Sequence, residues 1–354
     1  MDVPLSRVSR TGGRSREYRY PFSPFPSGWY RVAWSADLPL GKVLPLRYLG
    51  RDLVAFRSDS GRAAVLDAHC PHNGAHLGVG GCVKGEAIRC PFHGWQFDTT
   101  GRCTHVPDRD PPRVEIRSWE VREVNGAVLI WFDATGAAPT WEVAPWPEFG
   151  SPDWTPFVPI RTWRVRVHVQ DLIENSVDVA HFTQIHTHVA SQARSESLDI
   201  DGAALTHRVR VTFTSNGLAR LFPPAKGTIT VRLDGLSGVT SRAQVEGDSP
   251  LGFTTGFYMT PIDEEYAEAS GVMSIERRHP RIVTWFIMRQ ALRENKLALE
   301  QDISVFENKV FVERPLIQPL DGPILPYRRW ARQFYPEYAR DPGLRRDDGP
   351  TDGS

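Results

Sequence analysis

Two short loops, each with one cysteine and one histidine, constrain this chain more than any other feature. Cys70 and His72 form a C-P-H loop, and after seventeen residues Cys90 and His93 form a C-P-F-H loop. Thiolate and imidazole together suit a borderline-soft metal such as zinc or an iron–sulfur iron. Zinc fingers pair cysteine with cysteine and histidine with histidine, whereas each loop here supplies one of each.

This mixed pattern fits a [2Fe–2S] cluster of the Rieske type, in which two histidines replace two cysteines on one iron. Neutral imidazoles leave such a cluster less negative than four thiolates would and raise its reduction potential. The pattern therefore predicts a one-electron relay held by Cys70, His72, Cys90 and His93, with a zinc site as the alternative. The surrounding segments, CPHNGAHLGVGG and IRCPFHGWQFDTTGRC, resemble the Rieske domains of known oxygenases.

Length and charge narrow the remaining possibilities. A chain of 354 residues predicts about two domains. Lys+Arg and Asp+Glu are both 42, so the overall charge does not suggest nucleic acid or an anionic membrane surface as a partner. The sequence has no apolar signal-peptide core and no run of membrane-spanning length. Four cysteines are too few for a disulfide framework, so Cys82 and Cys103 are expected to be plain thiols and the cytoplasm the location.

The first part of the chain predicts a compact all-β unit that ends near Asp133. Apolar strands are expected at 29–33, 53–56 and 127–132, and Asn125-Gly126 predicts a hairpin turn before the last of them. A passage rich in proline and tryptophan follows at 137–159. Its prolines exclude helix and central strand, and its tryptophans favour an ordered crossing between domains.

The second part predicts an antiparallel sheet and a long helix. A strand at 163–169 should lead into a helical stretch ending near 181. Alternating patterns indicate further strands at 205–213, 227–233, 252–259, 267–275 and 281–288, with one buried face. A helix at about 292–312 should close the domain, and the composition beyond 340 predicts disorder.

A second candidate metal site lies at 175–186. Asn175, Asp178 and His181 are each three residues apart, so a helix would place them roughly on one face. His181 and His186 are five apart, about 140° around an ideal helix. Both reach one ion only if the helix ends or widens between them, and His188 is expected to be a loop residue. Two histidines and a carboxylate form the facial triad of non-haem Fe(II) oxygenases; the alternative is a pair of buried, hydrogen-bonded histidines.

The third ligand must come from elsewhere, and the closing helix offers Glu300, Asp302 and Glu307. The helical neighbours of Asp302 three and four residues away are all apolar: Ala298, Leu299, Val305 and Phe306. A charge among apolar neighbours is costly unless it is paired or bound to a cation. Asp302 is therefore the predicted ligand, and an exposed aspartate on a solvated stripe is the alternative.

From about residue 21 to 340 the chain resembles the oxygenase components of Rieske non-haem iron oxygenases. The family motif N-x-x-D-x-x-H-x-x-x-x-H matches Asn175, Asp178, His181 and His186, and Q-D-I at 301–303 matches the third-ligand helix. The resemblance implies an α+β fold: an all-β Rieske domain at 22–136, a helix-grip (START-like) catalytic domain at 137–340 and a tail at 341–354. In the helix-grip domain an antiparallel sheet grips a long C-terminal helix.

The resemblance also implies the cofactors and the assembly. One [2Fe–2S] cluster and one mononuclear Fe(II) are expected per subunit, in a homotrimer in which the cluster of one subunit feeds the iron of its neighbour. Asp178 would be the bridging carboxylate between His181 and a cluster histidine, His72 or His93. The absence of flavin and NAD(P)H motifs implies a separate NAD(P)H-dependent reductase or ferredoxin.

Within the family the framing phrases PFPSGWYRVAWSADLPLGKV and SWEVREVNGAVLIWFDATGAAPTWEV resemble 3-ketosteroid 9α-hydroxylase oxygenases and cholesterol 7-desaturases. This implies O₂-dependent hydroxylation or desaturation of an apolar, steroid-like substrate. Bulky pocket candidates, which an ordinary sheet core would also contain, are Leu218, Phe222, Phe253, Phe257, Trp285 and Phe286. The alternatives are an aromatic, heteroaromatic or N- or O-methyl substrate, and a non-catalytic electron carrier or lipid-binding module.

Overall fold

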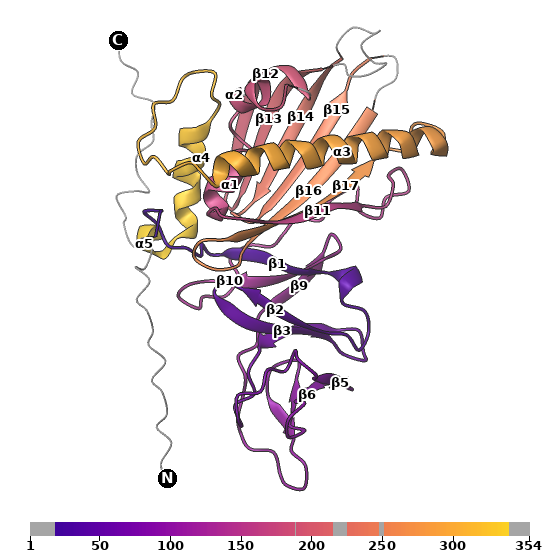
Figure 1. The fold of residues 1–354 in the computed structure, drawn as a ribbon, viewed down its shortest axis with the longest axis vertical. Helices are drawn as coiled ribbons and strands as arrows, with labels where there is room; N and C mark the ends of the chain where they lie inside the picture. Colours follow the sequence, from indigo (N-terminus) through magenta and orange to yellow (C-terminus); the bar gives the residue numbers. More distant parts are fainter. Residues whose placement is uncertain (1–17, 188, 215–224, 248–250, 340–354) are drawn as a thin grey trace, which may run out of the picture.

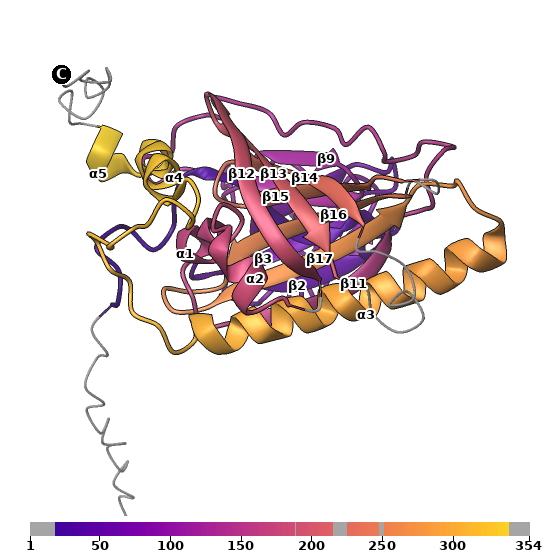
Figure 2. The same ribbon diagram turned by 90° about the horizontal axis from the view of Figure 1, so that it is seen from above.

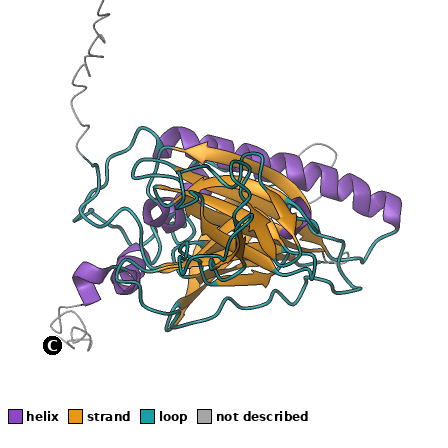
Figure 3. Ribbon diagram, turned by 90° about the horizontal axis from the view of Figure 1, so that it is seen from below, coloured by secondary structure: helices purple, strands orange, loops and turns teal. Residues whose placement is uncertain are grey.

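A computed structural model describes residues 18–187, 189–214, 225–247 and 251–339. Figure 1 shows two β-rich units, the N-terminal unit below and a larger sheet crossed by one long helix above. Seen from below in Figure 3, that helix runs along the outside of the strands. The mixed α+β architecture, with a long helix toward the C-terminus, agrees with the sequence prediction.

Three small antiparallel sheets build the N-terminal unit. The first contains β1 (Gly28–Trp34), β10 (Ala127–Phe132) and β9 (Val121–Val124), with the 3-10 turn η1 (Ser35–Asp37) after β1; the second contains β2 (Val43–Tyr48), β3 (Arg51–Arg57) and β4 (Ala63–Asp67); the third contains β5 (Cys82–Lys84), β6 (Ala87–Arg89), β7 (Gln96–Asp98) and β8 (Cys103–His105). Every residue of β10 is buried because that strand is the centre of its sheet. The strands predicted at 29–33, 53–56 and 127–132 are confirmed.

The predicted hairpin turn lies between β9 and β10. Asn125 and Gly126 both have positive φ, 55° and 72°, as a two-residue type I′ turn requires. The Asn125 side chain also fixes the chain beyond the turn, since its Nδ2 donates to the carbonyl of Ala144 and its Oδ1 accepts from the N–H of Trp146. The turn therefore ties the first unit to the passage that leaves it.

The proline- and tryptophan-rich passage is an ordered crossing, as predicted. Trp146 and Trp154 are 6 % exposed. Trp146 packs against Gly256 so closely that a Cβ there would lie 2.0 Å from the indole. Trp29 of the first unit donates from Nε1 to the carbonyl of Trp141, 2.8 Å away. Indole packing therefore holds the passage against both units.

The second unit is a seven-stranded antiparallel sheet. Its order is β11 (Val158–Val165), β17 (Ala267–Ile275), β16 (Leu251–Pro261), β15 (Gly238–Val245), β14 (Lys226–Asp234), β13 (Ala204–Phe213) and β12 (Ala190–Asp201). The α3 helix (Arg281–Phe306) crosses one face, as Figures 1 and 2 show. After it come α4 (Ile324–Ala331), the 3-10 turn η3 (Arg332–Phe334) and α5 (Pro336–Ala339).

Three predictions for this unit are wrong in detail. Residues 281–288 begin α3 and form no strand, so the helix starts eleven residues before the predicted 292 and ends at Phe306. Their β-branched and aromatic side chains favour a strand locally, but both neighbours of β17 are already present in the sheet. The first strand begins at Val158, not at 163, and strands β12 and β15 were not anticipated. The predicted disordered tail lies outside the described residues.

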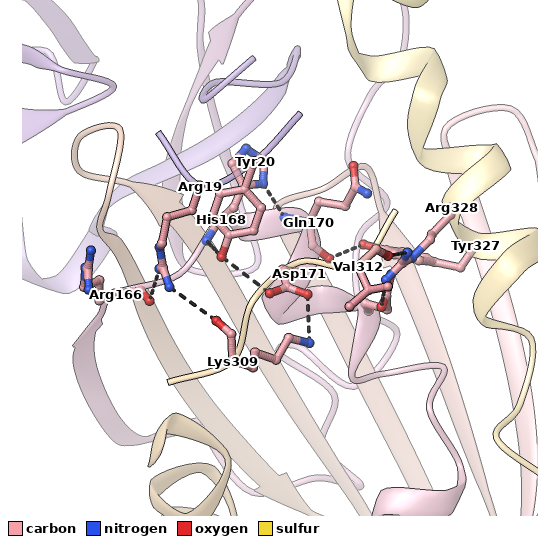
Figure 4. Close-up of polar contacts among 11 residues, drawn as sticks. Arg19, Tyr20, Arg166, His168, Gln170, Asp171, Lys309, Val312, Tyr327 and Arg328 are labelled. Atoms are coloured by element: carbon pink, nitrogen blue, oxygen red, sulfur yellow. Dashed lines mark hydrogen bonds and ion pairs between the residues drawn. The ribbon is translucent and has the colours of Figure 1, made fainter. Parts of the chain in front are cut away.

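The helical stretch predicted to end near 181 is two short helices, α1 (Val169–Glu174) and α2 (Ala180–Gln184). Figure 4 shows the polar contacts that fix α1. His168 caps it by accepting from the N–H of Gln170, and buried Asp171 pairs with Lys309 at 2.8 Å. At its other end, Glu174 forms a two-pronged ion pair with Arg328 of α4, at 2.6 and 2.7 Å.

The two units share a buried boundary. Glu268 of β17 accepts from Tyr48 of β2 at 2.8 Å and pairs with the buried Arg31 of β1. The backbone N–H of Leu49 donates to the carbonyl of Pro261, also at 2.8 Å. Because charged and backbone groups of the two units are paired here, these contacts fix the position of one unit against the other. No helix among the described residues is long and apolar enough to span a bilayer.

Candidate functional site

The two cysteine–histidine loops have the same backbone design. The N–H of Gly74 donates to the carbonyl of Cys70, and the N–H of Gly94 donates to the carbonyl of Cys90. Both glycines have positive φ, 72° and 73°, a conformation that costs glycine nothing. Each loop therefore turns back tightly behind its cysteine and presents the following histidine outward.

The four predicted cluster residues come together with their sulfurs inside and their imidazoles outside. Cys70 and Cys90 are 2 % and 3 % exposed, whereas His72 and His93 are exposed and their ring centroids lie 4.5 Å apart. Trp95 stacks on His72 at 4.7 Å and 9° between planes. This pairing suits a cluster with one iron on the sulfurs and the other on the imidazoles.

The chemistry of the sulfurs also calls for a metal. Burial, with the neighbouring Cys90 adding to it, raises the pKa of the Cys70 thiol to about 11. A bound metal holds such a sulfur as a thiolate, so the residues fit a [2Fe–2S] group. Cys82 and Cys103 are free thiols on β5 and β8, as predicted.

The second site brings together residues from α2, the loop after it and α3. His181, His186 and Asp302 are all buried, and one ligand atom from each lies within 4.8 Å of the others. The α2 helix ends at Gln184, between the histidines, as the five-residue spacing required. Their rings meet nearly at right angles, with centroids 5.0 Å apart. His188 lies outside the described residues.

Hydrogen bonds to Nδ1 set the orientation of each ring. His181 donates from Nδ1 to the backbone carbonyl of Asp178 at 2.6 Å, and Nδ1 of His186 lies 3.3 Å from Oε1 of Gln301. Nε2 is therefore the nitrogen of each ring that would bind a metal ion, and Nε2 of His186 is 3.2 Å from Oδ2 of Asp302. Gln301 was given no role from the sequence, although its position next to Asp302 was a signal for one.

The surroundings of Asp302 suit a carboxylate that binds a cation. Asp302 is 6 % exposed. Its Oδ1 lies 3.1 Å from Nε2 of His186, but it accepts no hydrogen bond from any described residue. The rival carboxylates are occupied elsewhere: Glu300 pairs with Arg161 at 2.7 Å, and Glu307 accepts from the N–H of Arg166. Two imidazoles and a buried carboxylate with one oxygen that accepts no hydrogen bond fit a divalent iron with open positions.

Asn175 and Asp178 occupy different positions around this triad. Asn175 ends α1 and lies between two ligands, with Nδ2 3.0 Å from Asp302 and 3.3 Å from Nε2 of His181. Asp178 orients His181 through its backbone, while its side chain is 33 % exposed. The carboxylate of Asp178 is therefore accessible from outside the chain.

A cavity of about 1330 Å³ extends from the triad between α3 and the sheet. Its wall is mainly apolar and includes Phe253, Phe257 and Phe286, three of the six predicted pocket residues. Trp285 does not line it, and Leu218 and Phe222 lie outside the described residues. Polar side chains that the sequence reading missed, Gln290, Glu294 and Asn295, line it from α3. The sequence offered one signal for them. Residues 298, 294 and 290 precede Asp302 at intervals of four, so a helix places them on the same face as Asp302.

Comparison with known proteins gives this arrangement a family. The 3-ketosteroid 9alpha-hydroxylase C-terminal domain matches residues 130–335, and the Rieske [2Fe-2S] domain matches residues 28–124. The chain belongs to the 3-ketosteroid 9α-hydroxylase family of Rieske oxygenases. This Rieske oxygenase is therefore an oxidoreductase with a [2Fe–2S] domain, which confirms the predicted family and argues against a non-catalytic carrier or lipid-binding module.

Named relatives of this Rieske oxygenase include oxygenases and desaturases. Cholesterol 7-desaturase nvd 1 of Ciona intestinalis is 31% identical, over 92% of this chain and 72% of the relative. A probable 3-ketosteroid-9-alpha-monooxygenase oxygenase component of Rhodococcus rhodochrous is 28% identical, over 88% and 81%. The solved structure of dicamba monooxygenase bound to dicamba shares the fold, with a TM-score of 0.69 and 21% identity over 87% of this chain and 96% of that one.

Proposed function

We propose that this Rieske oxygenase uses O₂ and two externally supplied electrons to hydroxylate or desaturate an apolar, steroid-like substrate. The observation that carries the proposal is the mainly apolar cavity that ends at His181, His186 and Asp302. At about 1330 Å³ it exceeds the roughly 300–1,000 Å³ of pockets for drug-sized ligands. A fused-ring skeleton is therefore a better match than a single aromatic ring.

In this proposal His181, His186 and Asp302 hold a mononuclear Fe(II), and Cys70, His72, Cys90 and His93 hold the cluster. The iron supplies a site at which O₂ is activated next to the substrate. The chain's own residues do the rest: Asp178 and Gln301 fix the two imidazoles, and the apolar wall excludes water and orients a carbon toward the triad.

Electron delivery calls for a neighbouring subunit. The strands β5 and β6 lie next to the cluster loops. Figure 1 places them at the opposite end of the folded molecule from α2 and α3. We therefore infer a homotrimer in which a partner's cluster docks near the exposed carboxylate of Asp178, which bridges it to His181. A separate NAD(P)H-dependent reductase or ferredoxin reduces the cluster, and the two thiols outside the cluster, Cys82 and Cys103, are not joined in a disulfide, which fits a reducing cytoplasm.

The first experiment tests the cofactors. Purified, iron-loaded protein should contain about three irons and two acid-labile sulfides per chain, and give a Rieske-type paramagnetic resonance signal on reduction. About two irons per chain, with the same signal, would remove the mononuclear site from the proposal. A Cys90→Ser variant should lose the signal while retaining the iron of the second site.

The second experiment tests the substrate. The loaded enzyme and a reductase are incubated with cholesterol, with a 3-ketosteroid and with dicamba. The molecular masses of the products are then measured by mass spectrometry. Gain of one oxygen indicates hydroxylation, and loss of two hydrogens indicates desaturation. Conversion of dicamba with both steroids untouched would favour the runner-up, an aromatic or N- or O-methyl substrate.

A further inference from the structure

The first half of α3 and the turn before it concentrate positive charge. Residues 277–293, RRHPRIVTWFIMRQALR, contain five arginines and no aspartate or glutamate, in a chain with equal numbers of both charges. Arg278 pairs with Glu276 at 2.8 Å. Arg281 and Arg289 form no ion pair with any described residue. The near-zero net charge of the whole chain therefore conceals a local excess of positive charge that ion pairs do not neutralise.

Large apolar side chains are exposed beside these arginines. Ile282, Trp285 and Phe286 are 63 %, 51 % and 60 % exposed. Together with Arg289, which lies over the Trp285 ring at 5.7 Å, they follow the i, i+3, i+4, i+7 spacing of one helix face. Figures 1 and 2 show this end of α3 extending past the sheet, away from the rest of the chain.

The same end of α3 is also where the cavity meets the surface. Val283 and Phe286 line the cavity, yet they are 41 % and 60 % exposed. A side chain that lines the cavity and is also exposed at the protein surface lies at the rim of an opening. An apolar ligand would therefore enter beside Trp285 and the unpaired arginines.

We propose that the first half of α3 lies on an anionic lipid surface and holds the mouth of the cavity against it. A helix with exposed tryptophan, phenylalanine and isoleucine beside arginines is the pattern of an interfacial helix, and each arginine adds attraction to anionic lipid. The contact is peripheral, since no described helix could cross a bilayer. Loading of a water-insoluble ligand from the lipid rests on the proposed function, whereas the lipid contact itself does not.

An acidic redox protein fits this surface less well. Such a partner must approach a cluster, and the strands β5 and β6 beside the cluster loops of the same chain lie far from this part of α3 in Figure 1. In the proposed homotrimer the neighbour's cluster docks near Asp178, between α1 and α2, which lie at the other end of α3. Exposed Ile282 and Trp285 also favour lipid, because a transient redox contact has no need of a deeply inserted apolar helix face.

Sedimentation with lipid vesicles tests the proposal without turnover. The iron-loaded protein is mixed with phosphatidylcholine vesicles, with or without phosphatidylserine. We expect it to sediment with the anionic vesicles and to be released by salt. The Arg281→Gln/Arg289→Gln variant should bind at least about tenfold more weakly, and Ile282→Ser/Trp285→Ser should bind anionic vesicles weakly at any salt concentration.

The control is Leu316→Ser/Leu320→Ser, which removes two side chains that are 94 % and 77 % exposed outside α3. It should bind vesicles like the wild type. Equal sedimentation with neutral and anionic vesicles, or equal loss in the control, would overturn the proposal. So would a change in oligomeric state in Ile282→Ser/Trp285→Ser, measured by analytical ultracentrifugation, because the face would then be a contact between copies. Thermal melting and cluster absorbance confirm that each variant is folded and loaded.

Discussion

Asn175 donates a hydrogen bond from Nδ2 to Oδ2 of Asp302, 3.0 Å away, although the two residues are 127 positions apart in the chain. The bond joins the end of α1 to α3 and brings the amide within 3.3 Å of His181. Because α1 is itself fixed by Lys309 and Arg328, the network in Figure 4 helps to set the geometry of the triad. We therefore propose Asn175 as a positioning residue for the predicted metal ligands.

We expect Asn175→Ala to weaken iron binding and to lower kcat by about 10- to 100-fold, as loss of a group supporting a metal ligand generally does. Iron content per chain and the rate with the native reductase measure the two effects. Asn308→Ala is the matched control, since the exposed Asn308 side chain just after α3 contacts neither His181 nor Asp302 and donates to the carbonyl of Ser304. Wild-type iron content and rate in Asn175→Ala would remove this role.

Gln301 should matter through His186 alone. Gln301→Ala removes the acceptor of the Nδ1 proton and should lower iron affinity by about 10- to 100-fold, whereas Gln301→Glu keeps an acceptor and should restore much of it. Iron release to a chelator measures both. If the two variants lose iron equally, Gln301 does not orient the imidazole.

Asp178→Asn should separate metal binding from turnover. The backbone carbonyl that accepts from His181 is unchanged by the substitution, so both metal sites should remain loaded. Only the side-chain carboxylate is lost, and product formation should stall if that group bridges two subunits. Iron content, the cluster signal and product yield are compared with those of the wild type. Substantial turnover with the native reductase would show that Asp178 is not the bridge.

Buried His168 should make the fold sensitive to acid. Burial lowers its pKa to about 3, whereas in the unfolded chain it takes up a proton near pH 6.5. The stability it supplies is complete above pH 6.5 and is lost as pH falls toward 3, by at most about 1.4 kcal/mol per pH unit.

Denaturant unfolding of wild type and His168→Gln at several pH values measures this loss. The advantage of the wild type should shrink by about 1.6 kcal/mol between pH 6.5 and 5, with both proteins in the same metal state. His105→Gln, which changes an exposed histidine, should leave the pH dependence unaltered. A constant difference between wild type and His168→Gln would contradict the assignment.

Local patterns predicted much of the fold. The strand β13 was found within one residue because one of its faces is buried and the other is not, so its residues alternate. The bounds of β17 were also found, although nearly all of its residues are buried. Residues 281–288 of α3 were predicted as a strand from an apparent alternating pattern, and Ile282, Val283 and Thr284 also favour that conformation locally. Its true state depends on a complete sheet beneath it, which no local pattern can reveal.

The sequence by itself determined the ligand chemistry. Cysteine and histidine spacing predicted the cluster loops, and an aspartate among apolar helical neighbours predicted Asp302 as a ligand, since metal chemistry depends on residue type and short-range spacing. The structure brings Asp302 together with His181 and His186. Only the tertiary structure decided what surrounds those ligands. The acceptor for His186, the cavity along α3 and the exposed arginine–tryptophan face arise where distant segments meet, and long-range packing decides which side chains are buried together.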